Sequence, residues 1–100
     1  MHRPRPHTIL LMFEFDPAKS ATNRAKHGID FEEVQALWSD TRRLEIPART
    51  LGEARWALVG RIGARHWTVI FTRRDDRFRL ISARRARKEE VALYEAEGFR

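Results

Sequence analysis

The sequence predicts an α+β domain, with helices packed on one face of an antiparallel β-sheet and the element order β-α-α-β-β-β-β-α. Two observations support this prediction. The first part of the chain contains two segments with helical spacing and start signals, and a third helical segment follows near its end. Between them lie segments of alternating apolar and charged residues, separated by short polar turns that suit hairpins. At 100 residues, the chain is long enough for one domain with a modest core.

The first elements are a short strand over residues 13–15 and a helix over residues 17–27. Asp16 can accept hydrogen bonds from the free N–H groups of the first helical turn, and Pro17 suits the first helical position. Gly28 can adopt the left-handed conformation that ends a helix. Both ends of this helix are therefore marked in the sequence.

Polar and basic side chains share one face of this helix. They recur at positions i, i+4, i+7 and i+8, which hold Lys19, Asn23, Lys26 and His27. Alanine is common at the other positions, so the helix buries little apolar surface. We therefore expect its shape to hold Lys26 and His27 in place, whereas Lys19 and Asn23 have an equal claim to a structural role.

A second helix is expected to begin at Asp30 and to end near residue 40. Asp30 and Glu33 have the spacing of a capping box, in which each side chain accepts from the other residue's backbone N–H. The apolar residues that follow helical spacing are Phe31, Val34, Leu37 and Trp38. This spacing predicts one buried face.

Four further strands are expected after this helix. The first is a short edge strand around Leu44 and Ile46, which stops at Pro47 because proline has no N–H to donate to a neighbouring strand. A turn over residues 49–53 follows. The longer strands span residues 55–62, 66–72 and 78–83, and tight connections at residues 63–65 and 73–77 predict antiparallel hairpins.

The last helix and the faces of the strands complete the expected fold. The helix spans residues 88–97, with Val91 and Tyr94 on one side and Gly98 as its stop. In strand 55–62, alternation separates Trp56, Leu58 and Ile62 from Arg55, Val59 and Arg61. In strand 78–83, it separates Phe78, Leu80 and Ser82 from Arg79, Ile81 and Ala83. Helices can thus cover one face while the other face carries arginines.

Residues 1–12 are expected to form a disordered basic leader, and residues 13–100 a single domain. Met12 could be the physiological start, since recognisable structure begins at Phe13. No apolar stretch approaches the roughly 18 residues needed to cross a bilayer, and no signal peptide is recognised, so we expect a cytoplasmic protein. The chain has no cysteine, which excludes disulfides and thiolate metal sites.

Positive charge is concentrated in one stretch of the chain. The net charge is +6, and residues 73–88 alone hold eight Arg or Lys and two Asp residues, a local excess of the same size. Local arginine is the electrostatic footprint of phosphate contact, and the guanidinium fork favours bidentate recognition. The alternative is a solvated face whose arginines pair with Glu89, Glu90 and Glu97. Trp56 and Trp67 are expected in the core, with base stacking by Trp67 as the alternative.

Other chemistries have no template in the sequence. His27 and His66 are too isolated to form a metal site with their sequence neighbours, and no HxxxH or HExxH spacing occurs. Residues 60–63 are not a phosphate loop, because no Lys-Ser/Thr pair follows them at a helix start. Taken alone, His27 is more typical of a helix C-cap than of a catalyst. We therefore expect no metal and no other cofactor.

Several segments together match a known family. They are Phe13-x-Phe-Asp16-x-x-Lys19-x-x-x-Asn23-x-x-Lys26-His27-Gly28-Ile-x-Phe31, Glu53-x-Arg55-x-x-x-Val59-Gly60, Arg77-x-Arg79-x-Ile81-Ser82-Ala-Arg84-x-Ala86, and then Glu90 and Tyr94. With these segments, the chain resembles the BrnT toxins of bacterial type II toxin–antitoxin systems over nearly its whole length. It departs from the family at Phe15, where the family usually carries Trp.

The resemblance implies a RelE-like ribonuclease fold and cleavage of cellular RNA that slows growth. It also implies neutralisation by a BrnA antitoxin that carries a ribbon-helix-helix DNA-binding domain. In such systems, toxin and antitoxin form a heterotetramer that represses its own operon. Contact with DNA is therefore expected through the antitoxin and not through this chain.

RNA cleavage without a metal needs a base for the 2′-OH, cations for the crowded phosphate and an acid for the leaving 5′-oxygen. His27 would act as general acid or base. Lys26, Arg55 and Arg84 would hold the scissile phosphate. The expected catalytic residues are Lys26, His27, Arg55, Arg84 and Glu90, of which Glu90 would orient an arginine or serve as base. The expected RNA-binding residues are Arg61, Arg77, Arg79 and Arg85.

Two other interpretations stay open at this point. The chain could be a basic nucleic-acid-binding module, or an inactive toxin-like interaction domain, which would need the arginines but not Lys26 and His27. The basic face could also serve mainly to dock an acidic antitoxin, and this role is compatible with catalysis because the inhibitor would cover the active surface.

Overall fold

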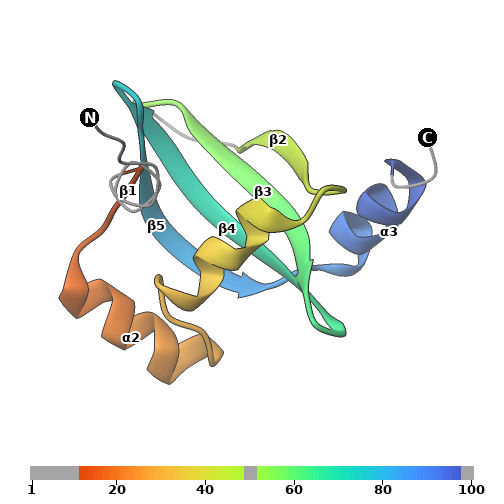
Figure 1. The fold of residues 1–100 in the computed structure, drawn as a ribbon, viewed down its shortest axis with the longest axis horizontal. Coiled ribbons are helices and arrows are strands. Elements are labelled where there is room, and N and C mark those ends of the chain that lie inside the picture. The colour runs from red at the N-terminus through yellow and green to blue at the C-terminus, as the bar shows by residue number, and fades with distance from the viewer. Residues whose placement is uncertain (1–11, 49–51, 98–100) are drawn as a thin grey trace, which may run out of the picture.

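The computed structural model describes residues 12–48 and 52–97, which form a five-stranded sheet with three helices (Figure 1). The elements are β1 (Phe13–Glu14), α2 (Pro17–His27), the 3₁₀-helix η1 (Glu33–Ser39), β2 (Leu44–Ala48), β3 (Arg55–Ile62), β4 (Arg65–Arg74), β5 (Arg77–Arg85) and α3 (Lys88–Glu97). The α+β class and the predicted element order are confirmed. The expected leader lies, apart from Met12, outside the described residues, as do most of the 49–53 turn and Gly98.

The sheet is mixed, and the prediction of an antiparallel sheet is wrong for one strand. The strand order is β1-β5-β4-β3-β2. The pairs from β2 to β5 are antiparallel, as their hairpins require, but β1 runs parallel to β5. Hairpin geometry constrains only strands that follow each other in the chain, and β1 is distant in sequence from β5. The predicted edge position of the strand that contains Pro47 is confirmed, since β2 ends the sheet.

The helices do not share one face of the sheet, which corrects a second prediction. Trp67 of β4 belongs to the core cluster beneath η1, whereas the alternating residue Thr68 donates its hydroxyl to Glu90 of α3 (2.9 Å). Thus η1 and α3 cover opposite faces. Only two residues separate β5 from α3, and Glu90 pairs with Arg84, which lies opposite Thr68 in the sheet. This pairing holds α3 on the second face.

A β-bulge in β5 reverses the side-chain alternation that the sequence predicts there. Phe71 pairs with Leu80 and Ile70 pairs with Ser82, so Ile81 is an extra residue without a partner in β4. Beyond it, Ala83 lies on the same face as Leu80 and is fully buried. The expected grouping of Ser82 with Leu80, and of Ala83 with Arg79, is therefore wrong.

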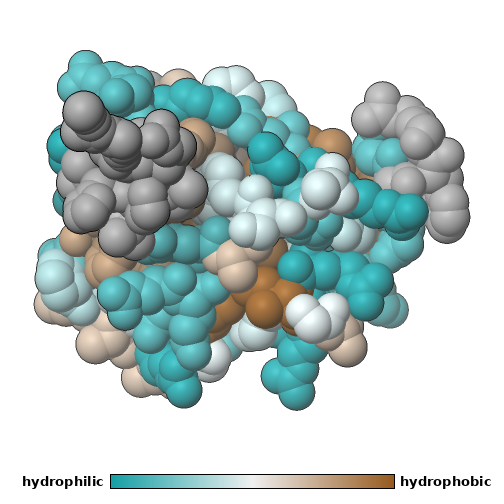
Figure 2. Space-filling model, viewed as in Figure 1, coloured by the Kyte–Doolittle hydropathy of each residue, from teal (hydrophilic) through white to brown (hydrophobic). Residues whose placement is uncertain are grey.

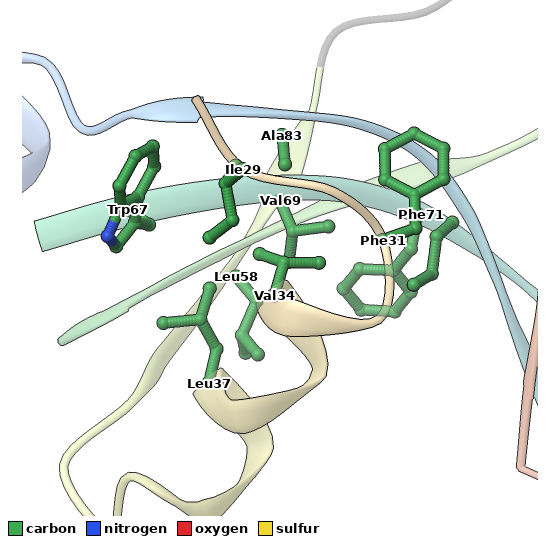
Figure 3. Close-up of a cluster of buried hydrophobic side chains, with 10 residues drawn as sticks. Ile29, Phe31, Val34, Leu37, Leu58, Trp67, Val69, Phe71 and Ala83 are labelled. Carbon is green, nitrogen blue, oxygen red and sulfur yellow. The ribbon is translucent and has the colours of Figure 1, made fainter. Parts of the chain in front are cut away.

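The core lies between η1, the loop before it and the sheet (Figure 3). Its members include Ile29, Phe31, Val34, Leu37, Leu58, Trp67, Val69, Phe71, Leu80 and Ala83. Trp67 is 6% exposed, so the core assignment is confirmed and base stacking by this ring has no open face to use. Gly60 lets η1 approach closely, because a Cβ there would lie 3.0 Å from Leu37 Cδ2.

The second predicted helix is present, but it is a 3₁₀-helix. The reciprocal hydrogen bonds of the predicted capping box are present, because Asp30 Oδ1 accepts from Glu33 N–H (2.7 Å) and Glu33 Oε1 accepts from Asp30 N–H (3.0 Å). The helix itself begins at Glu33, three residues after the predicted start. The buried residues Phe31, Val34 and Leu37 recur every three positions. A helix with three residues per turn aligns them toward the sheet better than an α-helix would.

The face of the molecule seen in Figure 1 is mostly hydrophilic, and hydrophobic side chains reach it only in a small area (Figure 2). No helix in the described part of the chain is long and apolar enough to cross a membrane.

Candidate functional site

Helix α2 has the ends that the sequence predicts. Asp16 accepts from Ala18 N–H (2.9 Å), Pro17 opens the helix, and Gly28 has φ +82° while its N–H donates to Arg24 O (2.9 Å). These caps set where the last turn, with Lys26 and His27, lies.

Asn23 ties α2 to the edge of β5. Its carboxamide accepts from Ala83 N–H (3.1 Å) and donates to Ala83 O (2.9 Å) and Ile29 O (2.8 Å). Strand β1 pairs with β5 only at Phe78 and Arg79, so the β5 edge at Ala83 has no strand beside it. The Asn23 side chain therefore takes the place of a strand, and it puts the end of α2 beside the carboxyl end of β5.

Lys26 and His27 lie one turn beyond Asn23 and are exposed. Within residues 12–48 and 52–97, neither side chain makes a hydrogen bond or an ion pair. Both side chains are thus open to a ligand at this position. Their place in the last turn also suits the helix dipole, so part of their role can be structural.

Arg84 and Glu90 form a bidentate ion pair on the face of β5 that α3 covers. Arg84 Nη1 donates to Glu90 Oε1 (2.8 Å) and Nη2 to Oε2 (3.0 Å). Glu90 Oε1 also accepts from the Thr68 hydroxyl (2.9 Å) and from Arg87 N–H (2.8 Å). The hydrogen bonds with Glu90 raise the pKa of Arg84.

The same contacts keep Glu90 ionised. Burial alone would raise the pKa of Glu90, but the hydrogen bonds from Arg84, Arg87 N–H and Thr68 outweigh burial and lower it to about 2. A carboxylate with this pKa, whose oxygens already accept four hydrogen bonds, is a poor proton acceptor. The geometry suits Glu90 to orienting Arg84, which was one of its two expected roles.

The structure divides the predicted residues between the two ends of the sheet. The site end, at the carboxyl end of β5, holds Lys26, His27, Arg61, Arg84, Arg85 and Glu90. The far end holds Arg55, Arg77 and Arg79. Four residues of β5 lie between Arg79 and Arg84, which puts these two residues about 15 Å apart along the strand. The structure thus groups all the predicted catalytic residues except Arg55.

Many arginines of the basic stretch pair with carboxylates, as the alternative of a paired surface predicts. Glu90 is one of the expected partners, and the other carboxylates in these pairs were not predicted. The pairs are Arg73 with Glu45, Arg74 with Glu53, Arg77 and Arg79 with Glu14, and Arg84 with Glu90. Arg85 instead lies over the Trp67 ring, 5.5 Å from its centroid, and Arg61 donates to Gly63 O (3.2 Å).

Asp40 is a residue of the site end that the sequence does not reveal. Strand β2 pairs with β3 only as far as Val59, so the N–H of Arg61 at that edge lacks a strand partner. Asp40 Oδ2 accepts from this N–H (2.8 Å) and from the Tyr94 hydroxyl (2.7 Å). Tyr94 is 4% exposed and belongs to the buried residues of the fold. Burial, followed by the hydrogen bond with Asp40, raises the pKa of Tyr94 to about 12.

The sequence predicts no metal site at His66, because no other metal-binding residue lies close to it in the chain. In the structure its Nε2 lies 3.0 Å from Glu95 Oε2, and its ring meets the Tyr94 ring edge-on at 5.2 Å. A surface hollow of about 620 Å³ adjoins this group, with Arg61, Tyr94 and Glu95 among its lining residues. Among the described residues, no cluster of His, Cys, Asp and Glu is placed to hold a metal ion.

The chain matches a known protein family. The family described as the ribonuclease toxin BrnT of type II toxin–antitoxin systems matches residues 15–90 of this chain. The matched region includes the predicted catalytic residues Lys26, His27, Arg55, Arg84 and Glu90. A search of curated proteins found no match.

Proposed function

Because the chain belongs to the BrnT family of ribonuclease toxins of type II toxin–antitoxin systems, we propose that it cleaves RNA without a metal ion and so arrests growth. The observation that carries this proposal is the site end. There, Arg84 is oriented by Glu90, and the contact of Asn23 with Ala83 puts the unpaired side chains of Lys26 and His27 at the same end of the sheet. We further propose that the fold is RelE-like and that the protein acts in the cytoplasm.

The proposed reaction is attack of a ribose 2′-oxygen on the adjacent phosphorus. As the phosphate becomes crowded, it gains negative charge that Arg84 and Lys26 can stabilise. His27 carries an imidazole, which can accept a proton on one ring nitrogen and donate one from the other, so it is a candidate to move a proton. The products would be a 2′,3′-cyclic phosphate and a free 5′-hydroxyl.

Glu90 acts in this proposal as a positioning residue. Two of the guanidinium N–H groups of Arg84 are occupied by Glu90, and the side chain of Arg84 remains 23% exposed. The remaining N–H groups of a planar fork would then face the substrate in a set orientation. Arg61 and Arg85 would bind RNA close to the cleaved bond.

The far end would contact RNA away from the cleaved bond. Arg55 is exposed, and Arg77 and Arg79 each lie within 3.7 Å of a Glu14 oxygen. Exchange of Glu14 for a phosphate would cost part of the attraction, so these arginines would add affinity and not rate. This assignment keeps Arg55 as an RNA-binding residue and moves it out of the catalytic group.

The proposed protein partner is a BrnA-type antitoxin with a ribbon-helix-helix domain. The two proteins would form a heterotetramer, and DNA would be bound by the antitoxin only. An acidic segment of the antitoxin would be attracted by the net charge of +6.

A non-catalytic interaction domain is the second candidate function. The observation in its favour is the Arg84–Glu90 pair itself, which neutralises the arginine that the reaction needs most. An inactive domain would retain this pair to anchor α3 to the sheet, and binding of RNA without turnover would follow.

RNA cleavage by the purified chain separates these functions. Mixed-sequence RNA is incubated with the protein in the presence of a chelator, and the new ends are mapped. The proposal expects 2′,3′-cyclic phosphate and 5′-hydroxyl ends at an undiminished rate. Cleavage that stops with the chelator, or that leaves 5′-phosphates, would contradict metal-independent chemistry, and binding without cleavage would favour the interaction domain.

A further inference from the structure

We infer that His66, oriented by Glu95, is the general base that takes the 2′-hydroxyl proton during RNA cleavage at the site end. The inference rests on the proposed ribonuclease function and adds a catalytic residue to it. It is carried by the place of His66 in the sheet, by its contact with Glu95 and by the hollow beside it.

The register of the sheet puts His66 among the arginines of the site end. Arg61 lies directly opposite His66 on β3, and Arg84 lies opposite Thr68, which is two positions from His66 on the same face. Directly opposite residues have Cβ atoms about 5 Å apart, and diagonal neighbours lie about 7–8 Å apart. A phosphate held by Arg61 and Arg84 would thus lie within reach of the imidazole.

The contact with Glu95 determines which ring nitrogen of His66 can act as a base. An ionised carboxylate only accepts hydrogen bonds, so Nε2 carries the hydrogen and donates to Glu95 Oε2 (3.0 Å). The lone pair then lies on Nδ1. Nδ1 has no hydrogen-bond partner, and it is not among the buried unpaired atoms of the described residues, so solvent reaches it.

This arrangement has the logic of a carboxylate–histidine pair. The carboxylate selects the tautomer and stabilises the imidazolium that forms when the ring takes a proton. The Tyr94 ring packs edge-on against His66 and restricts its rotation. His27 has neither support, because no carboxylate of the described chain contacts it.

The hollow of about 620 Å³ gives a substrate access to this group. It is lined by Ala36, Ser39, Asp40, Thr41, Arg42, Arg61, Ile62, Gly63, Tyr94 and Glu95, so its wall includes both residues that contact His66. The carboxylate of Asp40 already accepts hydrogen bonds from the Tyr94 hydroxyl and from two backbone N–H groups. Arg42 and Arg61 are therefore the lining residues that can bind a phosphate. A single-stranded RNA could lie across the hollow and approach His66 from there.

The step balances without a further reactant. Nδ1 of His66 takes the 2′-hydroxyl proton as the 2′-oxygen bonds to phosphorus, and the bond from phosphorus to the 5′-oxygen breaks. The leaving 5′-oxygen takes a proton from water, and the hydroxide so formed is neutralised by the proton that His66 releases. The products are the cyclic phosphate and the 5′-hydroxyl of the proposed function.

The test compares the pH dependence of RNA cleavage by the parental chain and by His66→Gln, Glu95→Gln and His27→Gln. The groups that face His66 are Glu95 and Tyr94 from α3, Arg61 from β3 and Arg84 from β5, and all are retained in His66→Gln. Glu32→Gln is the charge-matched control for Glu95→Gln, since Glu32 is exposed and lies away from the site end. Mixed-sequence RNA is the probe, and thermal unfolding checks the fold.

The inference expects His66→Gln to lower kcat/KM by about 100-fold or more, because a general base contributes this much. Glu95→Gln should move the midpoint of the acidic limb to lower pH, since the imidazolium loses its carboxylate. Glu32→Gln should leave rate and profile unchanged. A merely structural role for Glu95 would not move the midpoint.

Four results would overturn the inference. If the parental chain cleaves RNA and His66→Gln cleaves it at nearly the same rate, the inference fails and the proposed function stands. The same holds if His27→Gln is the one variant whose pH–rate profile loses its acidic limb. If the midpoint of the acidic limb of the pH–rate profile does not move in Glu95→Gln, the inference also fails. This result decides the question even where His66→Gln does not fold. Absence of cleavage by the parental chain would overturn the proposed function and this inference with it.

Discussion

The two ends of the sheet are both rich in arginine, but they differ in what the arginines touch. At the far end, Arg73 stacks over Trp56, Phe71 and Phe78 and binds Glu45 through two hydrogen bonds. Arg77 and Arg79 there share Glu14. At the site end, Lys26, Arg61 and Arg85 have no carboxylate ion pair among the described residues, and Arg84 is oriented by Glu90.

The number of arginines in a region therefore does not identify a functional site in this protein. The arginines of the far end link neighbouring strands. Carboxylates and aromatic rings already pair with most of their guanidinium groups. The site end keeps cations without partners next to one arginine of set orientation. Substitutions at the two ends should therefore have different consequences, for rate at the site end and for affinity or stability elsewhere.

The largest effect is expected from Arg84→Ala. Loss of the guanidinium removes the charge that stabilises the transition state, so growth arrest on induction should disappear while the fold is kept. The free energy of unfolding should fall by about 1–3 kcal/mol, because Glu90 loses two of its charged hydrogen bonds. Growth curves and thermal unfolding measure the two effects, and a variant that folds and still arrests growth would break the comparison.

Lys26→Ala tests the other side of the site end. We expect RNA cleavage to fall by about 10–100-fold, since one cation at the phosphate is lost. Lys19→Ala is the matched control, because Lys19 is an exposed lysine of the same helix about two turns away. Equal rates for the two variants would show that Lys26 does not act in the reaction.

Asn23→Ala tests how the site end is assembled. The variant loses three hydrogen bonds and leaves both backbone groups of Ala83 without their partner. The free energy of unfolding should fall by about 2–4 kcal/mol, against about 1 kcal/mol for Ser20→Ala, which loses a single bond from Phe31 N–H. Denaturant titrations compare them, and similar values would mean that the carboxamide does not replace a strand.

The low pKa of Glu90 predicts a pH dependence of stability. The pKa is about 2 in the fold and ordinarily 4.5, so the stabilisation is fully present above about pH 5 and is lost as the pH falls toward 2. Its size should be about 2–3 kcal/mol. Glu90→Gln should be less stable than the parental chain at neutral pH, and the difference should shrink in acid. A constant difference in unfolding free energy between pH 7 and the acidic limit of folding would contradict the assignment.

The smallest effect is expected from Arg79→Ala at the far end. Its ion pair with Glu14 is partly exposed, so stability should change by less than about 1 kcal/mol. The KM for RNA should rise by a few-fold, kcat should stay at the parental value, and the salt dependence of binding should weaken by about one charge. A fall in kcat would place the far end in the reaction.

The sequence predicts the capped elements well. Asp16, Pro17 and Gly28 mark both ends of α2, and the predicted bounds of α2, β3 and α3 agree with the structure. The parallel pairing of β1 and the bulge at Ile81 were not predicted, because neither follows from local spacing. The position of α3 on the second face depends on the pairing of Glu90 with Arg84 and Thr68, which only the folded register brings together.

The site was predicted in part for the same reason. The spacing in α2 and the arginine cluster identify Lys26, His27 and Arg84 as candidates. The contacts of Asp40 with Tyr94 and of His66 with Glu95 span 54 and 29 residues and leave no local signal. Arg55 belongs to one of the family segments, but it begins β3, whereas Arg61 near the other end of β3 lies at the site end. The length of the strand therefore puts Arg55 at the far end.

The central claim, that chemistry occurs at the site end and the far end adds only affinity, is tested most directly by single-turnover cleavage at saturating RNA. The rates of Arg84→Ala and Arg79→Ala are compared with the parental rate. We expect a loss of about 100-fold or more for Arg84→Ala and a parental rate for Arg79→Ala. A parental rate in Arg84→Ala, or an equal loss in both variants, would contradict it.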